Sequence, residues 1–423
     1  MTISKLSIPV EATLVNNGVP VRDDNRRLGR RGGFWAVAAS VAALTAFSTA
    51  PSALYGTYAR QDHLSAITTT IVYAVYAAGI LVSLFLVGHV SDWYGRRPVL
   101  IPAIVTAVLA GLVFTSSTSL PALLIGRVLT GLALGAAVAT ATAYLTDLDA
   151  GPGTAATRRS QIAATVANVG GLAVGPLLAG LVAVHVDADP RAVLGLFTAL
   201  LVLALLAVAA APEGRPRPRI HPRYRPQRVA MPSTARAEFG AALIGDFLVF
   251  SVFGVFAGLA SRFLVGTLHQ PSPVLAGLTV FVSFGLGALT QVTTMTWPLR
   301  RLVGLGIPFL IVGLSAVVAA AWIQPPSLVL FLAGAGVAGV GSGAIYRSTL
   351  TVVLAAAPPQ ERAAALALFF AVGYVGLSLP VIGAGVALLY VSFKIVLLVL
   401  AVAVASGLLV ASPLLLRLSP GRA

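Results

Sequence analysis

The chain consists mainly of long apolar runs separated by short polar segments. The apolar runs lie at about 33–56, 68–90, 98–115, 121–145, 161–185, 191–211, 238–265, 274–296, 302–322, 327–355, 363–389 and 394–416. A helix needs about 20 apolar residues to cross roughly 30 Å of hydrocarbon, and each run approaches or exceeds that length. The pattern therefore predicts an all-α membrane protein with twelve transmembrane helices.

The composition agrees with this prediction and excludes several kinds of chemistry. Hydrophobic residues make up 58% of the 423 positions and charged residues only 10%, whereas a soluble domain of this size carries far more charge. The absence of cysteine excludes disulfides, thiolate metal sites and cysteine nucleophiles. No phosphate-binding G-x-x-x-x-G-K-[ST] loop and no cluster of catalytic side chains is found. We therefore expect neither a cofactor nor enzymatic activity.

The basic residues indicate how the chain lies in the membrane. The net charge is +15, and most of the 28 basic residues fall in the N-terminal tail, the even-numbered connections and the C-terminal tail. Cytoplasmic loops of membrane proteins carry such an excess, so we expect both termini in the cytoplasm and no nucleic-acid partner. Arginine far outnumbers lysine in an alanine- and glycine-rich background, which is typical of a bacterial chain and favours the inner membrane.

One proline- and arginine-rich stretch, residues 212–237, divides six apolar runs from six. Its prolines prevent a continuous helix, and its charge favours anionic lipid headgroups nearby. The expected organisation is a cytoplasmic tail (1–32), a six-helix half (33–211), a cytoplasmic linker (212–237), a second six-helix half (238–416) and a short cytoplasmic tail (417–423).

The two halves resemble each other at a fixed spacing. Arg96–Arg97 recur as Arg300–Arg301 at an offset of 204 residues, and Pro176 recurs as Pro380 at the same offset. Internal repeats of this kind predict two pseudo-symmetric halves with a substrate site between them near the bilayer midplane. One half would then rock against the other, giving alternating access.

The connection after the second span reads G-H-V-S-D-W-Y-G-R-R, from Gly88 to Arg97. It resembles the G-x-x-x-D-R/K-x-G-R/K-R/K signature of the major facilitator superfamily, whose length and hydropathy match nearly the whole chain. The resemblance implies a secondary transporter, usually a monomer. Trp93 departs from the signature, because the family usually has a basic residue there.

The resemblance also assigns a gating network to this loop. Gly88 and Gly95 would permit close helix approach and a tight turn. Asp92 would dock against the N-terminal end of the eleventh span, where the helix dipole favours a carboxylate. Arg96, followed by Arg97, would bridge Asp92 to Asp147 and lock the outward-open state. The alternative is that the two arginines only obey the positive-inside rule.

Two further segments resemble signatures of the superfamily. Arg127 opens R-V-L-T-G in the fourth span, like the family's R-x-x-x-G, and either faces a cavity or snorkels to the nearby surface. The fifth span resembles the G-x-x-x-G-P-x-x-G-G signature of drug:proton antiporters. The matching residues are Gly171, Gly175, Pro176 and Gly180. Ala179 replaces one glycine, and Ile162 stands where an upstream glycine belongs.

Asp246 is the one carboxylate that lies well inside a predicted span. At 1.5 Å per residue, it and Arg347 of the tenth span lie roughly 12 Å deep on the same side of the membrane. By resemblance, the seventh and tenth spans line the cavity. We expect these two residues to pair in one state and separate on protonation or substrate binding, coupling protons to transport. A static ion pair is the alternative.

Together these features predict proton-coupled efflux of small lipophilic compounds by alternating access. Few buried polar groups are available for a hydrophilic substrate, whereas aromatic residues in the spans could form an apolar cavity. These aromatic residues are Tyr55, Tyr58, Tyr73, Tyr76, Phe247, Phe250, Phe253, Phe369, Phe370 and Tyr374. The alternative is a proton-coupled importer of a small polar or anionic solute, with Arg127 and Arg347 as anion ligands. A membrane receptor or scaffold is a third reading.

Overall fold

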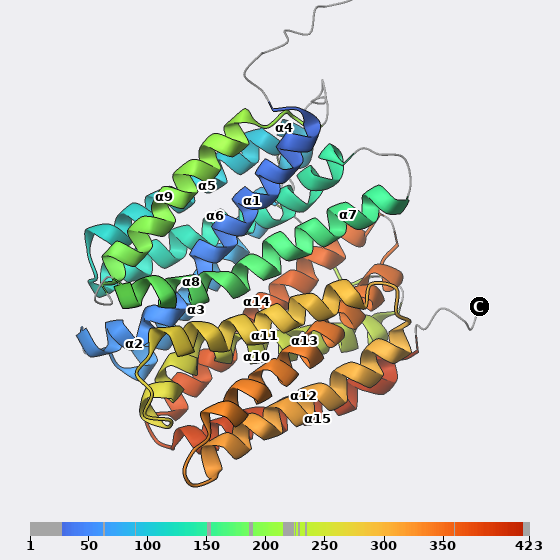
Figure 1. Cartoon of the computed structure of the whole chain (residues 1–423). Helices are drawn as coiled ribbons and strands as arrows, with labels where there is room; N and C mark the ends of the chain where they lie inside the picture. Colours follow the sequence, from blue (N-terminus) through green and yellow to red (C-terminus); the bar gives the residue numbers. More distant parts are fainter. Residues whose placement is uncertain are drawn as a thin grey trace, which may run out of the picture.

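The computed structural model describes residues 28–61, 64–88, 90–149, 154–185, 189–214, 224, 226, 229–232, 235–358 and 360–417. Within these ranges the secondary structure is helical, without strands. Twelve segments are long and apolar enough to cross a membrane. The all-α prediction with twelve spans is therefore confirmed, and the protein is a multi-pass membrane protein (Figure 1).

The first six spans form the N-terminal half, drawn in blue to green in Figure 1. Their helices are α1 (Arg30–Thr49), α2 (Pro51–Gln61), α3 (Ala66–Val87), the short loop helix α4 (Ser91–Tyr94), α5 (Arg96–Ser116), α6 (Leu120–Leu148), α7 (Thr154–Thr165), the π-helical segment η1 (Val166–Gly170), α8 (Gly171–His185) and α9 (Pro190–Ala210).

The other six spans form the C-terminal half, drawn in yellow-green to red. Their helices are α10 (Arg236–Gly266), α11 (Pro273–Thr293), α12 (Leu299–Trp322), α13 (Leu328–Ala356), α14 (Arg362–Ala387) and α15 (Phe393–Leu415). We call the side on which α1 begins and α15 ends the terminal side. The predicted tail (1–32) and linker (212–237) lie largely outside the described residues.

Local sequence explains where several spans begin and where two are interrupted. Capping side chains precede four helices, where Ser65, Asp189, Ser272 and Ser327 accept hydrogen bonds from backbone N–H groups of the first turn. The first span breaks between α1 and α2 at Pro51, which has no N–H to donate. The fifth span contains the wider turn η1 immediately before the Gly171 motif.

The two halves approach each other closely on the side opposite the termini. There α8 lies against the start of α11, because Gly180 leaves room for the backbone of Pro273. Figure 1 shows these two helices side by side at the junction of the halves. Near the same side, the Arg262 guanidinium of α10 donates to the Leu64 carbonyl oxygen at 2.6 Å, next to the start of α3. The halves are thus held together at this end.

Candidate transport site and gate

The loop between the second and third spans makes a tight turn at Gly95. This residue ends α4 and precedes α5 with φ of +98°, a conformation that side chains with a Cβ rarely adopt. Gly88 caps the end of α3, and its N–H donates to the Leu84 carbonyl. The turn directs Arg96 back toward the bundle, where only 8% of the residue is exposed.

Arg96 is the centre of an ion-pair network on the terminal side. Its Nη1 donates to Asp92 Oδ1 at 2.6 Å and to Ser91 Oγ at 2.8 Å, and its Nε donates to Asp147 Oδ2 at 3.1 Å. The Asp147 side chain is 4% exposed, while that of Asp92 is 61% exposed. The structure therefore brings together the three charged residues that the loop signature implied.

The gate differs from the expectation in one contact. The resemblance predicts that Asp92 docks against the start of α14, but in this conformation its side chain is 61% exposed. The docked arrangement stays a prediction for another conformation. Arg97 instead uses its guanidinium within its own half, donating to the carbonyl oxygen of Ala209 at the end of α9.

Sequence reasoning missed Glu213 as a member of this network. Its Oε1 accepts hydrogen bonds from the backbone N–H groups of Arg96 at 2.8 Å and Arg97 at 3.4 Å. A carboxylate at this position caps the first turn of α5 and lies favourably in its helix dipole. No sequence signal marks this contact, because 117 positions separate Glu213 from Arg96.

Arg127 is buried inside the N-terminal half, with 1% of the residue exposed. Its Nη1 donates to the Ser48 carbonyl at 2.7 Å, close to the break between α1 and α2. The guanidinium carbon lies 4.5 Å from the ring centre of Tyr76 and 5.8 Å from that of Tyr73, whose π faces attract cations. The snorkelling alternative is thus wrong, since Arg127 does not reach the surface. Its Nε has no hydrogen-bond partner.

Asp246 is fully buried in α10, and neither carboxyl oxygen has a hydrogen-bond partner. Gly373 of α14 makes room for the carboxyl, because a Cβ at that position would lie 2.5 Å from Asp246 Oδ2. Tyr346 and Tyr374 lie near enough to interact electrostatically with it. Both rings pack on Phe250, with centroids 6.0 and 5.8 Å away.

Arg347 does not pair with Asp246 in this conformation. Its Nη2 donates to the Met295 carbonyl oxygen at 2.5 Å, beyond the end of α11. Neighbouring residues on a helix point about 100° apart, and it is Tyr346, next to Arg347, that lies near enough to interact electrostatically with the carboxyl. The alternative of a static ion pair is not found here, and pairing in another state stays a prediction.

The glycines of the fifth span serve as close-packing positions. A Cβ at Gly171 would collide with Thr45, and one at Gly175 with the Ala46 backbone, so α8 packs tightly on α1. The next part of α8 faces the other half. A Cβ at Gly180 would lie 2.5 Å from the Pro273 carbonyl oxygen, and the Pro176 carbonyl faces Gly277 of α11.

The site therefore contains two buried ionisable side chains with unpartnered polar atoms, Arg127 Nε in the N-terminal half and both carboxyl oxygens of Asp246 in the C-terminal half. Arg127 offers a cation surrounded by tyrosine rings, and Asp246 offers a carboxyl among aromatic rings. Such groups are costly in a bilayer and mark substrate or ion pathways. In the part of the chain that the structure describes, no three His, Cys, Asp or Glu side chains are grouped to hold a metal ion.

These features are those of a polytopic α-helical membrane protein built from two six-helix halves. The sequence profile of the Major Facilitator Superfamily matches residues 35–297, more than half of the chain. The chain belongs to this superfamily and is therefore a transporter rather than an enzyme. No curated protein matches it in sequence.

Solved structures show the same fold at low sequence identity. A bacterial homologue of the human lysosomal transporter Spinster superposes with a TM-score of 0.66 at 17% identity, covering 93% of this chain and 99% of the other. A variant of the nucleoside transporter NupG gives 0.65 at 13% identity, covering 91% and 99%. The human organic anion transporter TETRAN gives 0.62 at 17% identity, covering 92% and 100%.

Proposed function

We propose that this protein exports small lipophilic compounds in exchange for protons by alternating access, and that Asp246 is the proton-coupling group. The observation that carries the proposal is the burial of Asp246 with neither oxygen hydrogen-bonded. An ionised carboxylate in such surroundings is costly, so the neutral acid is favoured in this conformation. Opening of the site would hydrate the carboxyl and allow proton release.

The surroundings of Asp246 suit a lipophilic substrate. Phe250, Tyr346 and Tyr374 supply aromatic faces on three different helices around the carboxyl. A protonated amine or another lipophilic cation would be attracted both to these rings and to the carboxylate. Such a cation and a proton would compete for Asp246. This competition would couple export of the cation to entry of the proton.

The gate supports alternating access. In this conformation the halves are joined on the side opposite the termini, and the Asp92 carboxylate is exposed on the terminal side. Docking of Asp92 on the start of α14 would join the halves at the terminal side instead. The proposed cycle exchanges these two sets of contacts.

The test uses inverted membrane vesicles with an acidic lumen and a pH-sensitive dye. A panel of lipophilic cations and neutral drugs is added to the native protein, to Asp246→Asn and to Glu238→Gln. Glu238 is a matched control because it lies two turns earlier on α10, at its first turn. We expect a transported compound to release lumenal protons through the native protein and Glu238→Gln but not through Asp246→Asn. An equal response from Asp246→Asn would refute the coupling role, and no response to any compound would refute proton-coupled efflux.

Arg127 supports a second candidate, a proton-coupled importer of a small anionic solute. Its buried guanidinium has an unpartnered Nε, and the hydroxyl of Tyr55 nearby also has no hydrogen-bond partner. Labelled organic anions should then enter right-side-out vesicles when the outside is acidic, and Arg127→Gln should abolish the uptake. Absence of uptake with the native protein would exclude this candidate.

A further inference from the structure

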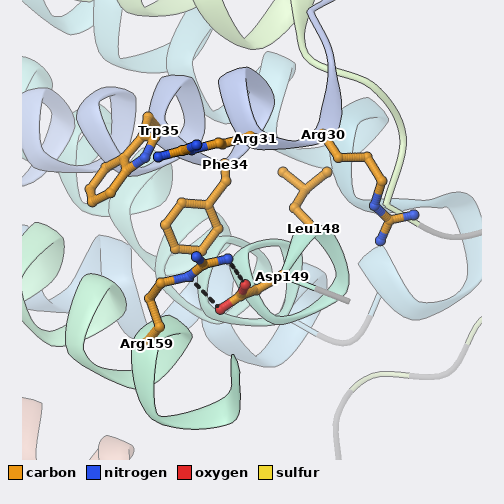
Figure 2. Close-up of a pocket in the computed structure, with 7 residues that line it drawn as sticks. All are labelled: Arg30, Arg31, Phe34, Trp35, Leu148, Asp149 and Arg159. Atoms are coloured by element: carbon orange, nitrogen blue, oxygen red, sulfur yellow. Dashed lines mark hydrogen bonds and ion pairs between the residues drawn. The ribbon is translucent and has the colours of Figure 1, made fainter. Parts of the chain in front are cut away.

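A groove between α1 and α7 combines a basic end with an apolar floor. Its volume is about 880 Å³, within the range of small-molecule sites. The lining residues are Trp35, Ala38, Ala39, Ala42, Arg158, Arg159, Ile162, Ala163, Val166 and Ala167. A smaller pocket of about 220 Å³ adjoins it at the terminal side and adds Arg30, Arg31 and Phe34 (Figure 2).

The groove opens on the outside of the N-terminal half. Trp35 is 58% exposed and Val166 is 54% exposed, although both lie within membrane spans. In Figure 1, α1 and α7 both face the viewer on the front of the bundle. Trp35 and Arg159 each lie about one turn inside the terminal-side end of their span, the depth at which tryptophan and arginine meet lipid headgroups.

The basic end is held in place by buried partners. Arg159 pairs with Asp149, whose side chain is only 1% exposed, while the Arg159 side chain is 60% exposed. The Arg159 guanidinium also lies 5.4 Å from the ring centre of Phe34, and Figure 2 shows this ring directly above it. The carboxylate thus points into the protein, and the guanidinium is presented toward the groove.

The charges at this end are mostly uncompensated. The two pockets are lined by four arginines and one aspartate. Arg30 is occupied elsewhere, because its Nη2 donates to the Asp147 carbonyl oxygen at 2.5 Å. Arg31, Arg158 and Arg159 remain exposed around the mouth, and guanidinium groups bind phosphate oxygens with paired hydrogen bonds.

We propose that this groove binds an anionic phospholipid of the surrounding bilayer. The phosphate of the headgroup lies among Arg31, Arg158 and Arg159, next to Trp35. One acyl chain follows the apolar floor, which extends from Arg159 to Ala167 for about 12 Å along α7 and η1 at 1.5 Å per residue. The site is separate from Arg127 and Asp246 and does not depend on what the protein transports.

The test uses quenching of tryptophan fluorescence by brominated lipids in reconstituted full-length protein. One variant keeps Trp35 as its only tryptophan, and a matched control keeps only Trp297. Trp297 is 41% exposed and lies on the same side of the membrane, near the exposed arginine pair Arg300–Arg301. Brominated phosphatidylglycerol is titrated at low mole fraction against brominated phosphatidylcholine.

We expect phosphatidylglycerol to quench Trp35 at a much lower mole fraction than phosphatidylcholine does, with a much smaller difference at Trp297. Each arginine near a membrane surface favours anionic lipid about fivefold. The double variant Arg31→Gln/Arg158→Gln should therefore weaken the preference on the order of 25-fold. The variant Ala39→Phe keeps the charges and fills the groove, and it should reduce quenching of Trp35 to the level seen at Trp297.

Two outcomes would overturn the proposal. Equal quenching of Trp35 by both lipids would show a groove that accepts any acyl chain without recognising the headgroup. Quenching of Trp35 no stronger than that of Trp297 would show that lipid does not occupy the groove, leaving a protein partner as its occupant. Circular dichroism and monodispersity of each variant establish that it is folded.

Discussion

The close contact between α8 and α11 should control which side of the transporter is closed. A Cβ at Gly180 would lie 2.5 Å from the Pro273 carbonyl oxygen, 2.8 Å from its carbonyl carbon and 2.9 Å from Val274 Cα. All three atoms belong to the backbone, so no side chain can rotate away. Gly180→Ala therefore requires the helices to separate by about 1 Å to regain normal contact.

Gly285 of α11 provides a matched control in the same interface. A Cβ there would lie 3.8 Å from Ala173 Cβ of α8, an ordinary van der Waals contact. Overpacking typically costs about 1–3 kcal/mol. Gly180→Ala should therefore shift the equilibrium away from the conformation closed opposite the termini by about fivefold to 150-fold. Gly285→Ala should leave this equilibrium nearly unchanged.

The shift can be measured by pulsed electron resonance between spin labels. The chain has no cysteine, so labels attach only where cysteine is introduced. Exposed positions are available at both ends of the bundle. Ser119 precedes α6 and Ile323 follows α12 on the side opposite the termini, and Thr146 of α6 and Leu354 of α13 lie on the terminal side. We expect Gly180→Ala to increase the long-distance population at Ser119 and Ile323 and to decrease it at the terminal-side pair.

Identical distance distributions for Gly180→Ala and the native protein would refute the reasoning. A shift of equal size in Gly285→Ala would also refute it, because the effect would then not arise from the close backbone contact. The thermal unfolding transition of the labelled protein in detergent shows whether Gly180→Ala is folded. This measurement distinguishes unfolding from a shift of the conformational equilibrium.

Three further predictions concern the charged side chains, and each is tested by thermal or denaturant unfolding in detergent. Arg127→Lys should lose roughly 2 kcal/mol, because an ammonium cannot reproduce the planar contact with the tyrosine rings; unchanged stability would contradict this. A double-mutant cycle for Arg96 and Asp147 should give a coupling energy of about 1–3 kcal/mol, and one for Arg96 and the exposed Asp92 less than about 1 kcal/mol; the reverse order would show that burial does not set these couplings. Glu213→Gln should cost about 1 kcal/mol by weakening the cap of α5, and a stability equal to that of the native protein would remove Glu213 from the network.

The sequence by itself determined the fold class and the number of spans. Apolar length and the placement of arginines are sufficient for this, because the bilayer requires each span to satisfy its own backbone hydrogen bonds. The loop from Gly88 to Arg97 was also informative, since Gly95 has the positive φ and Arg96 the two carboxylate partners that its signature implied. Such a turn can be predicted from the sequence, because the residues that form it lie close together along the chain.

Only the tertiary structure decided which distant groups meet. Equal depth indicates that Asp246 and Arg347 could pair, but depth does not fix rotation about a helix axis, and Arg347 donates to the Met295 carbonyl oxygen instead. Glu213 caps α5 from 117 positions away, with no local pattern to reveal it. The burial of Arg127 against tyrosine rings likewise depends on how α3 packs on α6. Helix rotation and packing arise from many weak contacts summed over the whole bundle, so no single stretch of sequence specifies them.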